Sequence, residues 1–485
     1  MQHDKDNKKL SDTSGFFKDT NTFLNVYSSL LREFDLSKIN SILSSSKKKG
    51  VDGKNIFQVL FVLPFLNIDN IRGLMRLGIS KELCNKKDVY YDFLKNERID
   101  WRKILSLFAG QFLKITAKNT IDDIRSPECL IVDDSTLPKS GKKIELIGKV
   151  YDHCGHTYKL GMKLLTLGHW DGKSFLPLDF SLHNEPGKTR SRGLKKKHLK
   201  AQFTKERDRG SAGGKRVEEV SRDKISMALA MIKRAVKKIR SVDYVLADSW
   251  FITEKFITGI RAIRPKDGKA PNVIGLMKTN RIFTMGKRRA KASLIPGLKR
   301  KQIKYCSKYK CHYIALKVEY KEIPLKIFCV KMRGQENWKM LITTDKKLGF
   351  IKAMKYYQIR WSIEVFFRDC KQNMGLNKCQ SIDFDAYIAS ISICFMNYIV
   401  LSLRKRFDDY ETLGELFHHL KEGFLEATII EKIWLFLDEL CKSILVELGV
   451  DRDIFIRKLI ENEKNIVGQM KNELGILFST NRKAA

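Results

Sequence analysis

The chain has 485 residues, enough for two to four domains, and its 43% hydrophobic content is typical of a globular protein with a buried core. It carries 92 Lys and Arg against 55 Asp and Glu, a net charge of +37. A surplus this large indicates a polyanionic partner, most commonly nucleic acid, although a merely solvated basic surface would have the same composition.

Three features bear on where the chain works. The N-terminal sequence MQHDKDNKKL lacks the apolar core of a signal peptide. No run reaches the roughly 20 apolar residues of a membrane span, and the longest, near Ile56–Leu66 and Ile388–Leu403, are better interpreted as buried helices. The ten cysteines are scattered without framework spacing. We therefore expect a reducing, cytoplasmic location, associated with the nucleoid in a bacterium, and no membrane partner.

The first quarter of the chain is predicted to be helical. Residues 1–20 are polar and predict a disordered tail. Within residues 21–124, apolar side chains recur at three- and four-residue spacing in Thr22–Phe34, Gly53–Leu66 and Trp101–Thr116. This pattern predicts an all-α region, which we expect to bind DNA.

A strand and a hairpin follow. Glu128–Asp134 (ECLIVDD) is a short apolar run that ends in acidic residues. Tyr158–His169 and Lys173–Phe180 have the pattern of strands, with Trp170-Asp171-Gly172 between them as a turn.

Residues 186–216 form a basic segment with twelve Lys and Arg, only two acids and five glycines. This composition predicts a mobile basic loop, and equally a plain solvated linker. If the loop contacts DNA, the run Lys195, Lys196 and Lys197 is the candidate contact.

The rest of the chain alternates and then becomes β-rich. Val217–Ile239 predicts a helix, Asp243–Asp248 (DYVLAD) a second apolar strand ending in acid, and Phe251–Ile263 a helix. Residues 272–344 are strand-like, Lys352–Gln372 predicts a strong helix, and helices continue to the end. The order predicts an α/β core over 125–262 and 345–380, interrupted by a β-rich insertion at 263–344 and followed by a helical region, 381–485, that could dimerise.

Three acidic residues are candidates for catalysis. Asp134 ends the first apolar strand, Asp248 ends the second, and Glu364 lies on the long helix. Carboxylates at the ends of neighbouring strands lie close together and repel one another unless a divalent cation is present. Oxygen ligands favour Mg²⁺ or Mn²⁺, and two such ions can activate the attacking oxygen and stabilise the leaving oxygen in phosphoryl transfer. Each aspartate alone could equally be a simple strand terminator.

The long helix adds a polar stripe. At 100° per residue, Tyr357, Arg360, Glu364 and Lys371 fall within about 60° of one another, opposite Ile359, Ile363 and Phe366. Such a stripe could simply face water. Arg, Lys and Tyr beside a metal-binding glutamate also suit a clamp for phosphate oxygens.

The spacing Tyr-x2-Arg-x3-Glu-x6-Lys resembles the signature of bacterial insertion-sequence transposases of the insertion-sequence-four type, which are DDE enzymes. Val132–Leu137 (VDDSTL) and Tyr244–Trp250 (YVLADSW) resemble the first and second motifs of that family. The resemblance covers about residues 125–375. It implies a ribonuclease H-like core with a β-rich insertion before the glutamate. In some members of the family an aromatic residue from the insertion stacks on a flipped base; Trp338 is the candidate here, and the alternative is a core tryptophan on a strand.

The resemblance also implies roles for residues. Asp134, Asp248 and Glu364 would bind two Mg²⁺ or Mn²⁺ ions, and Tyr357, Arg360 and Lys371 would contact the DNA end. The implied reaction is cleavage at the terminal inverted repeats of a transposon and transfer of the freed 3′-hydroxyl into target DNA, by a homodimer that holds two ends.

Some alternatives stay open. Asp133 and Asp134 point to opposite faces of a strand. Asp134 is favoured as the metal ligand because the family's aspartate directly precedes the hydroxyl pair, and Asp133 is the alternative. The chain could also be a ribonuclease H-like nuclease without strand transfer, or a catalytically inactive DNA-binding protein.

Overall fold

The computed structural model describes residues 27–28, 30–47, 49–66, 70–76, 86–118, 126–152, 155–187, 191–239, 241–265, 268–407 and 410–423, together with the single residues 425, 440, 444 and 447. By compactness the chain divides into residues 1–29 with 422–485, and residues 30–421. The fold below is that of the second unit. The predicted tail 1–20, residues 22–26 and 29 of the helix predicted at 22–34, and most of the region beyond 423 lie outside the described residues.

Short helices form the N-terminal part of this unit. They are α4 (Ser37–Ser45), α5 (Gly53–Val62) with the 3₁₀ turn η1 (Leu63–Leu66), α6 (Ile71–Arg76), α7 (Lys87–Leu94) and α8 (Trp101–Lys118). Asp52 begins α5, because its carboxylate accepts a hydrogen bond from the backbone N–H of Lys54. The helices predicted at 53–66 and 101–116 are therefore present, within a residue or two of their expected ends.

A five-stranded mixed sheet forms the core. Its strands lie in the order β4-β3-β1-β5-β6, and their bounds are β1 (Cys129–Pro138), β3 (Thr157–Trp170), β4 (Phe175–His183), β5 (Tyr244–Ala247) and β6 (Asn272–Met277). Strand β1 is antiparallel to β3 and parallel to β5, and β6 is parallel to β5. A short strand, β2 (Gly148–Asp152), pairs with the beginning of β3. This mixed α/β arrangement is consistent with the expected ribonuclease H-like fold.

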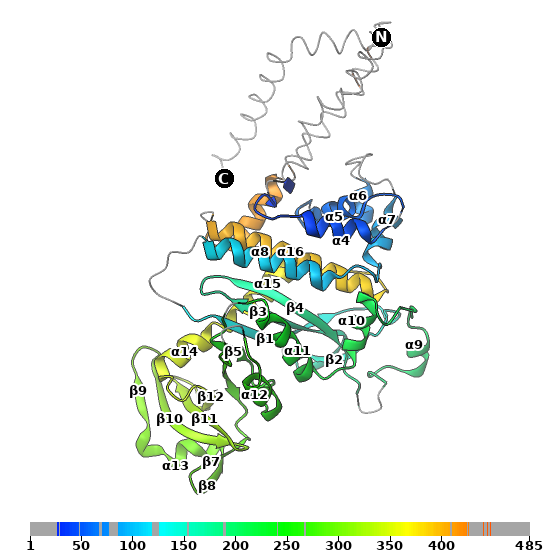
Figure 1. The fold of residues 1–485 in the computed structure, drawn as a ribbon. Helices are drawn as coiled ribbons and strands as arrows, with labels where there is room; N and C mark the ends of the chain where they lie inside the picture. The colour runs from blue at the N-terminus through cyan, green and yellow to red at the C-terminus, as the bar shows by residue number, and fades with distance from the viewer. Residues whose placement is uncertain are drawn as a thin grey trace. The chain divides into compact units, whose positions relative to one another are not determined.

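Helices pack on this sheet (Figure 1). Helix α8 and the apolar helix α16 (Phe384–Phe407) lie side by side and both contact β4. Helix α11 (Lys224–Val236) contacts β3, β4 and α12 (Glu254–Arg261), whereas α15 (Trp361–Gln372) contacts β1, β4 and α16. Within the described residues, α16 is long and apolar enough to cross a membrane, but 94% of its most apolar stretch is buried in the protein. It is therefore a core helix, as its sequence predicted.

The β-rich block extends the same sheet. Strand β12 (Lys339–Thr343) pairs with β6, and the order continues through β11 (Ile323–Met332), β10 (Cys311–Tyr320), β7 (Ile282–Met285) and β8 (Arg288–Lys291). The insertion that the sequence predicted at residues 263–344 includes β6. Strand β6 pairs in parallel with β5 and so continues the parallel part of the sheet.

The basic segment differs from the mobile loop that its composition predicted. Over its described residues it contains α9 (Lys196–Lys200) and the beginning of α10 (Ala212–Val220). The guanidinium of Arg207 pairs with the carboxylates of Glu145 and Asp385, at 2.7 and 2.9 Å, and its side chain is buried. Arg216 is also buried, against Glu219. Buried acids from other parts of the chain thus hold this segment, whereas the three lysines at 195–197 are exposed.

Candidate active site

Strand pairing brings the two aspartate motifs together. Strands β1 and β5 are parallel, and their last paired residues are Val132 and Ala247. The next residues are Asp133 on β1 and Asp248, which directly follows β5. The two carboxyl groups therefore come from adjacent positions at the same end of neighbouring strands. The sequence favoured Asp134 as the partner of Asp248, with Asp133 as the alternative.

The alternation of β1 separates Asp133 from Asp134. The guanidinium of Arg360 donates to Asp133, with Nη1 3.0 Å from Oδ2, and the Lys371 ammonium donates to the hydroxyl of Ser135 at 2.7 Å. Asp133 and Ser135 thus face α15. Asp134 lies on the other face of the strand, where its carboxylate has different partners.

Those partners are two lysines. The Lys224 ammonium, at the beginning of α11, lies 2.5 Å from Asp134 Oδ2, and the Lys163 ammonium on β3 lies 3.8 Å from Oδ1. Lys163 is buried, with 3% of its side chain exposed, and it also donates to the hydroxyl of Thr136. Asp134, the ligand that the sequence favoured, is therefore held in a lysine cluster, and it is Asp133 that the structure brings to the glutamate-bearing helix.

The long helix predicted over 352–372 is two helices. Helix α14 (Phe350–Gln358) ends at a tighter turn, and α15 begins at Trp361. Across this turn the backbone N–H groups of Ile359 and Arg360 bond three residues back rather than four, to Tyr356 and Tyr357. The tighter turn shifts Tyr357 around the helix axis relative to Arg360 and Glu364. The four residues of the predicted stripe still lie on the side that faces β1, with Arg360 over the ring of Tyr357.

Arg360 connects the acids. Its guanidinium bonds Asp133 through Nη1 and Glu364 through Nη2, the latter at 2.5 Å. The carboxylate of Glu364 is about one-third exposed, so one end of this cluster is open to solvent. A single planar cation therefore spans two carboxylates contributed by elements 231 residues apart in the sequence.

The surroundings of Asp133 disfavour the ionised form of its carboxyl group. Burial raises the pKa of Asp133 to about 7, and the negative charges of Asp134 and Asp248 act in the same direction, whereas Arg360 opposes them. Burial likewise raises the pKa of Tyr357 to about 12, so that its hydroxyl keeps its proton at neutral pH. A further cation near Asp133 would stabilise its ionised form.

The acids suit a hard divalent cation in their chemistry. Asp133, Asp248 and Glu364 offer only oxygen ligands, as Mg²⁺ and Mn²⁺ prefer. As the side chains lie, no three acidic, histidine or cysteine side chains in the described part of the chain are grouped tightly enough to hold an ion. At this site Arg360 bonds one oxygen of Asp133 and one of Glu364.

Two exposed tryptophans flank the acids. Trp250, two residues after Asp248, has the Lys224 ammonium 4.2 Å from its ring centroid. Trp361 follows Arg360 and is 61% exposed. By contrast Trp338, the predicted stacking residue, is partly buried against the core of the sheet just before β12. The sequence analysis missed Trp250, Trp361 and the two lysines beside Asp134, because Lys163 and Lys224 reach Asp134 only through the pairing of β1 with β3 and the position of α11.

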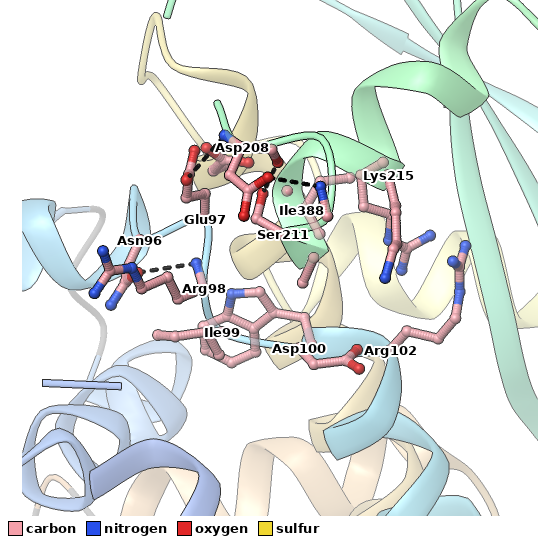
Figure 2. A pocket seen from close by; sticks show the side chains of 16 residues that line it. Asn96, Glu97, Arg98, Ile99, Asp100, Arg102, Asp208, Ser211, Lys215 and Ile388 are labelled. Atoms are coloured by element: carbon pink, nitrogen blue, oxygen red, sulfur yellow. Dashed lines mark hydrogen bonds between the residues drawn. The ribbon is translucent and has the colours of Figure 1, made fainter. Parts of the chain in front are cut away.

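A separate cavity of about 640 Å³ lies elsewhere (Figure 2). Its walls come from the segment between α7 and α8, including Glu97, and from the beginning of α10, where Ser211 caps the helix. The backbone N–H of Gly213 donates to the carbonyl of Glu97. None of Asp133, Asp248 and Glu364 lines this cavity, which instead marks where the basic segment joins the N-terminal helices.

Comparison with known families agrees with this geometry. A family model described as DDE superfamily endonuclease matches residues 77–264, and one described as transposase DDE domain matches residues 222–400. The first match contains β1 and β5 with both aspartate motifs, and the second contains Asp248 and α15. No curated protein matches the chain. The two matches support a DDE transposase.

Proposed function

We propose that this chain, which the two family matches support as a DDE transposase, cuts DNA at the ends of a mobile element and joins the freed 3′-hydroxyl to target DNA. The observation that carries the proposal is the cluster in which Arg360 bonds both Asp133 and Glu364 while Asp248 follows the neighbouring strand. The insertion-sequence-four type remains the subfamily whose signature the chain resembles.

We assign the first acid of the site to Asp133, with Asp134 as the alternative. Asp133 faces α15, whereas Asp134 faces two lysines. An acid that holds a divalent cation must turn its oxygens toward the other ligands, and an acid already neutralised by two ammonium groups gains less from a metal. Asp134 then has a structural role, in which it compensates the buried charge of Lys163.

Asp133, Asp248 and Glu364 would hold two Mg²⁺ or Mn²⁺ ions. When bound, the metal supplies activation of the attacking oxygen and stabilisation of the leaving oxygen in phosphoryl transfer. Arg360 holds the acids together in the resting site. In the DNA complex we expect its planar guanidinium to turn to a phosphate at the DNA end, which Lys371 and the Tyr357 hydroxyl also contact.

The partner is DNA. The net charge of +37 and the exposed lysines at 195–197 favour binding through backbone phosphates. Because a mobile element has two ends, we expect a homodimer in the complex that holds both, with each protomer supplying one set of acids.

A cleavage and joining assay tests this function. The purified chain is incubated with Mg²⁺, a labelled duplex carrying the terminal repeat of the DNA that flanks its gene, and a supercoiled target plasmid. The proposal predicts a cut at the repeat and a joined product. Cutting without joining would favour a nuclease, and binding without cutting under both Mg²⁺ and Mn²⁺ would indicate an inactive DNA-binding protein.

A further inference from the structure

The outer part of the insertion has charges of one sign only. Between Lys278 and Lys317 the chain contains thirteen Lys and Arg and no Asp or Glu. These forty residues therefore supply about a third of the net charge of +37. The site described above uses none of them, and the segment lies outside the basic segment at 186–216.

The topology gathers this segment along one edge of the sheet. Strand β10 pairs with β11 on one side along its whole length. On its other side, β9 (Lys304–Cys306) pairs with its beginning and β7 with its end, and β8 pairs with β7. The short helix α13 (Ile295–Leu298) and the turn η3 (Arg300–Gln302) lie between β8 and β9 in the chain. The segment thus forms the outer edge of the insertion (Figure 1).

The cations on this edge are exposed and lack acidic partners. Eleven of the thirteen side chains are exposed, among them Arg288, Arg289, Lys301 and Lys304. None of the thirteen forms an ion pair with any acid in the described ranges of the chain. Like charges at this density repel one another, with only partial screening at physiological salt, so the surface lowers its free energy when a polyanion covers it.

We propose that this surface, the cationic edge formed by residues 278–317, binds the phosphate backbone of duplex DNA without regard to sequence. The proposal rests on the proposed function, because that function brings DNA to the same sheet. Strand β5, which positions Asp248, is connected across the sheet to β7 through β6, β12, β11 and β10, and β8 pairs beyond β7. Five strand spacings of about 4.8 Å place the edge roughly 24 Å from β5 across the sheet.

That separation fits a single duplex. At 3.4 Å per base pair, roughly 24 Å corresponds to about seven base pairs, so one DNA could contact both the acids and the cationic edge. We therefore expect the edge to hold DNA about seven base pairs from the cut, on one side of it. The surface would add affinity and fix the direction of the duplex, and the acids would set the position of the cut.

The test compares two variants with equal charge loss. In the first, Arg288, Arg289, Lys301 and Lys304 are changed to Gln. In the control, four exposed cations that already pair with acids are changed to Gln: Lys159, Arg222, Lys255 and Lys321. Affinity for a short duplex of unrelated sequence is measured by fluorescence anisotropy over a range of KCl concentrations, and thermal unfolding confirms that both variants fold.

Each phosphate contact contributes roughly 0.9 to the slope of log affinity against log salt. We expect the first variant to lose about 2–4 from that slope and the control to lose less than about 1. Equal slopes for the two variants would overturn the proposal. Competition by RNA or by anionic lipid vesicles more effectively than by duplex DNA would also overturn it, because the partner would then be of another class.

A second measurement needs no substitution. Lysine acetylation of the full wild-type chain, with and without the duplex, is read by mass spectrometry. We expect DNA to protect Lys301 and Lys304, and not Lys159, which pairs with Asp152. Without such protection the edge does not contact DNA, whereas normal cutting at element ends would still support the proposed function. If DNA protects Lys301 and Lys304 but the chain does not cut element ends, the result would support DNA binding by the cationic edge and overturn the proposed function.

Discussion

Replacing the carboxylate by an amide at Asp133 and, in a second variant, at Asp134 should separate effects on catalysis from effects on stability. Asp133→Asn removes a buried carboxyl whose charge is disfavoured by burial and by Asp134 and Asp248. We expect its free energy of unfolding to change by less than about 1 kcal/mol, because the lost ion pair with Arg360 is offset by the lost repulsion. Cleavage should fall by about three orders of magnitude, or roughly 4 kcal/mol, because metal binding supplies several kcal/mol of transition-state stabilisation.

Asp134→Asn should do the reverse. It leaves the ammonium of Lys163, of which 3% is exposed, without an ionised partner. Breaking a buried pair costs about 3–5 kcal/mol. Because the amide oxygen still accepts a hydrogen bond, we expect a loss of about 1–3 kcal/mol in unfolding free energy. Cleavage, measured below the unfolding transition, should fall less than about tenfold, which corresponds to 1.4 kcal/mol.

The assay for both variants is urea unfolding, followed by single-turnover cleavage of labelled end DNA with Mg²⁺. The reasoning is refuted if Asp134→Asn is inactive yet as stable as the wild type while Asp133→Asn still cuts. The metal ligand would then be Asp134, and its contacts with the two lysines would have to break when metal binds.

The other predictions concern the clamp, the basic segment and a buried histidine. Arg360→Lys keeps the charge but loses the planar donor that spans two carboxylates, so cleavage should fall at least about tenfold. Lys371→Ala should lower cleavage by a similar factor. Normal cleavage rates for both variants would mean that the two side chains contact β1 without contacting DNA. Neutralising the exposed lysines at 195–197 should lower the salt slope of DNA affinity by about 1–3, and an unchanged slope would indicate a solvated surface. Burial, with the charge of Lys224, lowers the pKa of His183 from 6.5 to about 4, so below pH 6.5 the unfolded chain binds the extra proton and stability falls as the pH drops toward 4. His183→Gln should remove on the order of 3 kcal/mol of that pH dependence in urea unfolding, and an identical pH profile would show that the imidazole is not held neutral.

Much of the fold follows from local patterns. The apolar runs ECLIVDD and DYVLAD became the central strands β1 and β5, and the period of Trp101–Thr116 became α8. Each of these signals depends only on which side chains must be buried, and burial is encoded within a single element. The acids at the ends of β1 and β5 could be predicted for the same reason.

What could not be predicted depends on partners distant in sequence. Alternation along β1 shows that Asp133 and Asp134 face opposite ways, but only the packing of α15 and α11 decides which of them faces Glu364. The composition of the basic segment predicted a mobile loop because the acids that pair with Arg207, Glu145 and Asp385, lie outside the segment. The tighter turn before Arg360 has no sequence signal that we can identify.

The central claim is that the acids gathered by β1, β5 and α15 cut DNA with a divalent metal. Its most direct test is single-turnover cleavage of end DNA in Mg²⁺ by Asp248→Ala and Glu364→Ala, with Glu218→Ala, an exposed acid on α10, as the matched control. The account predicts that the first two retain less than about one per cent of wild-type cleavage while binding end DNA normally, and that the control cuts like the wild type. Substantial cleavage by either of the first two variants would contradict it.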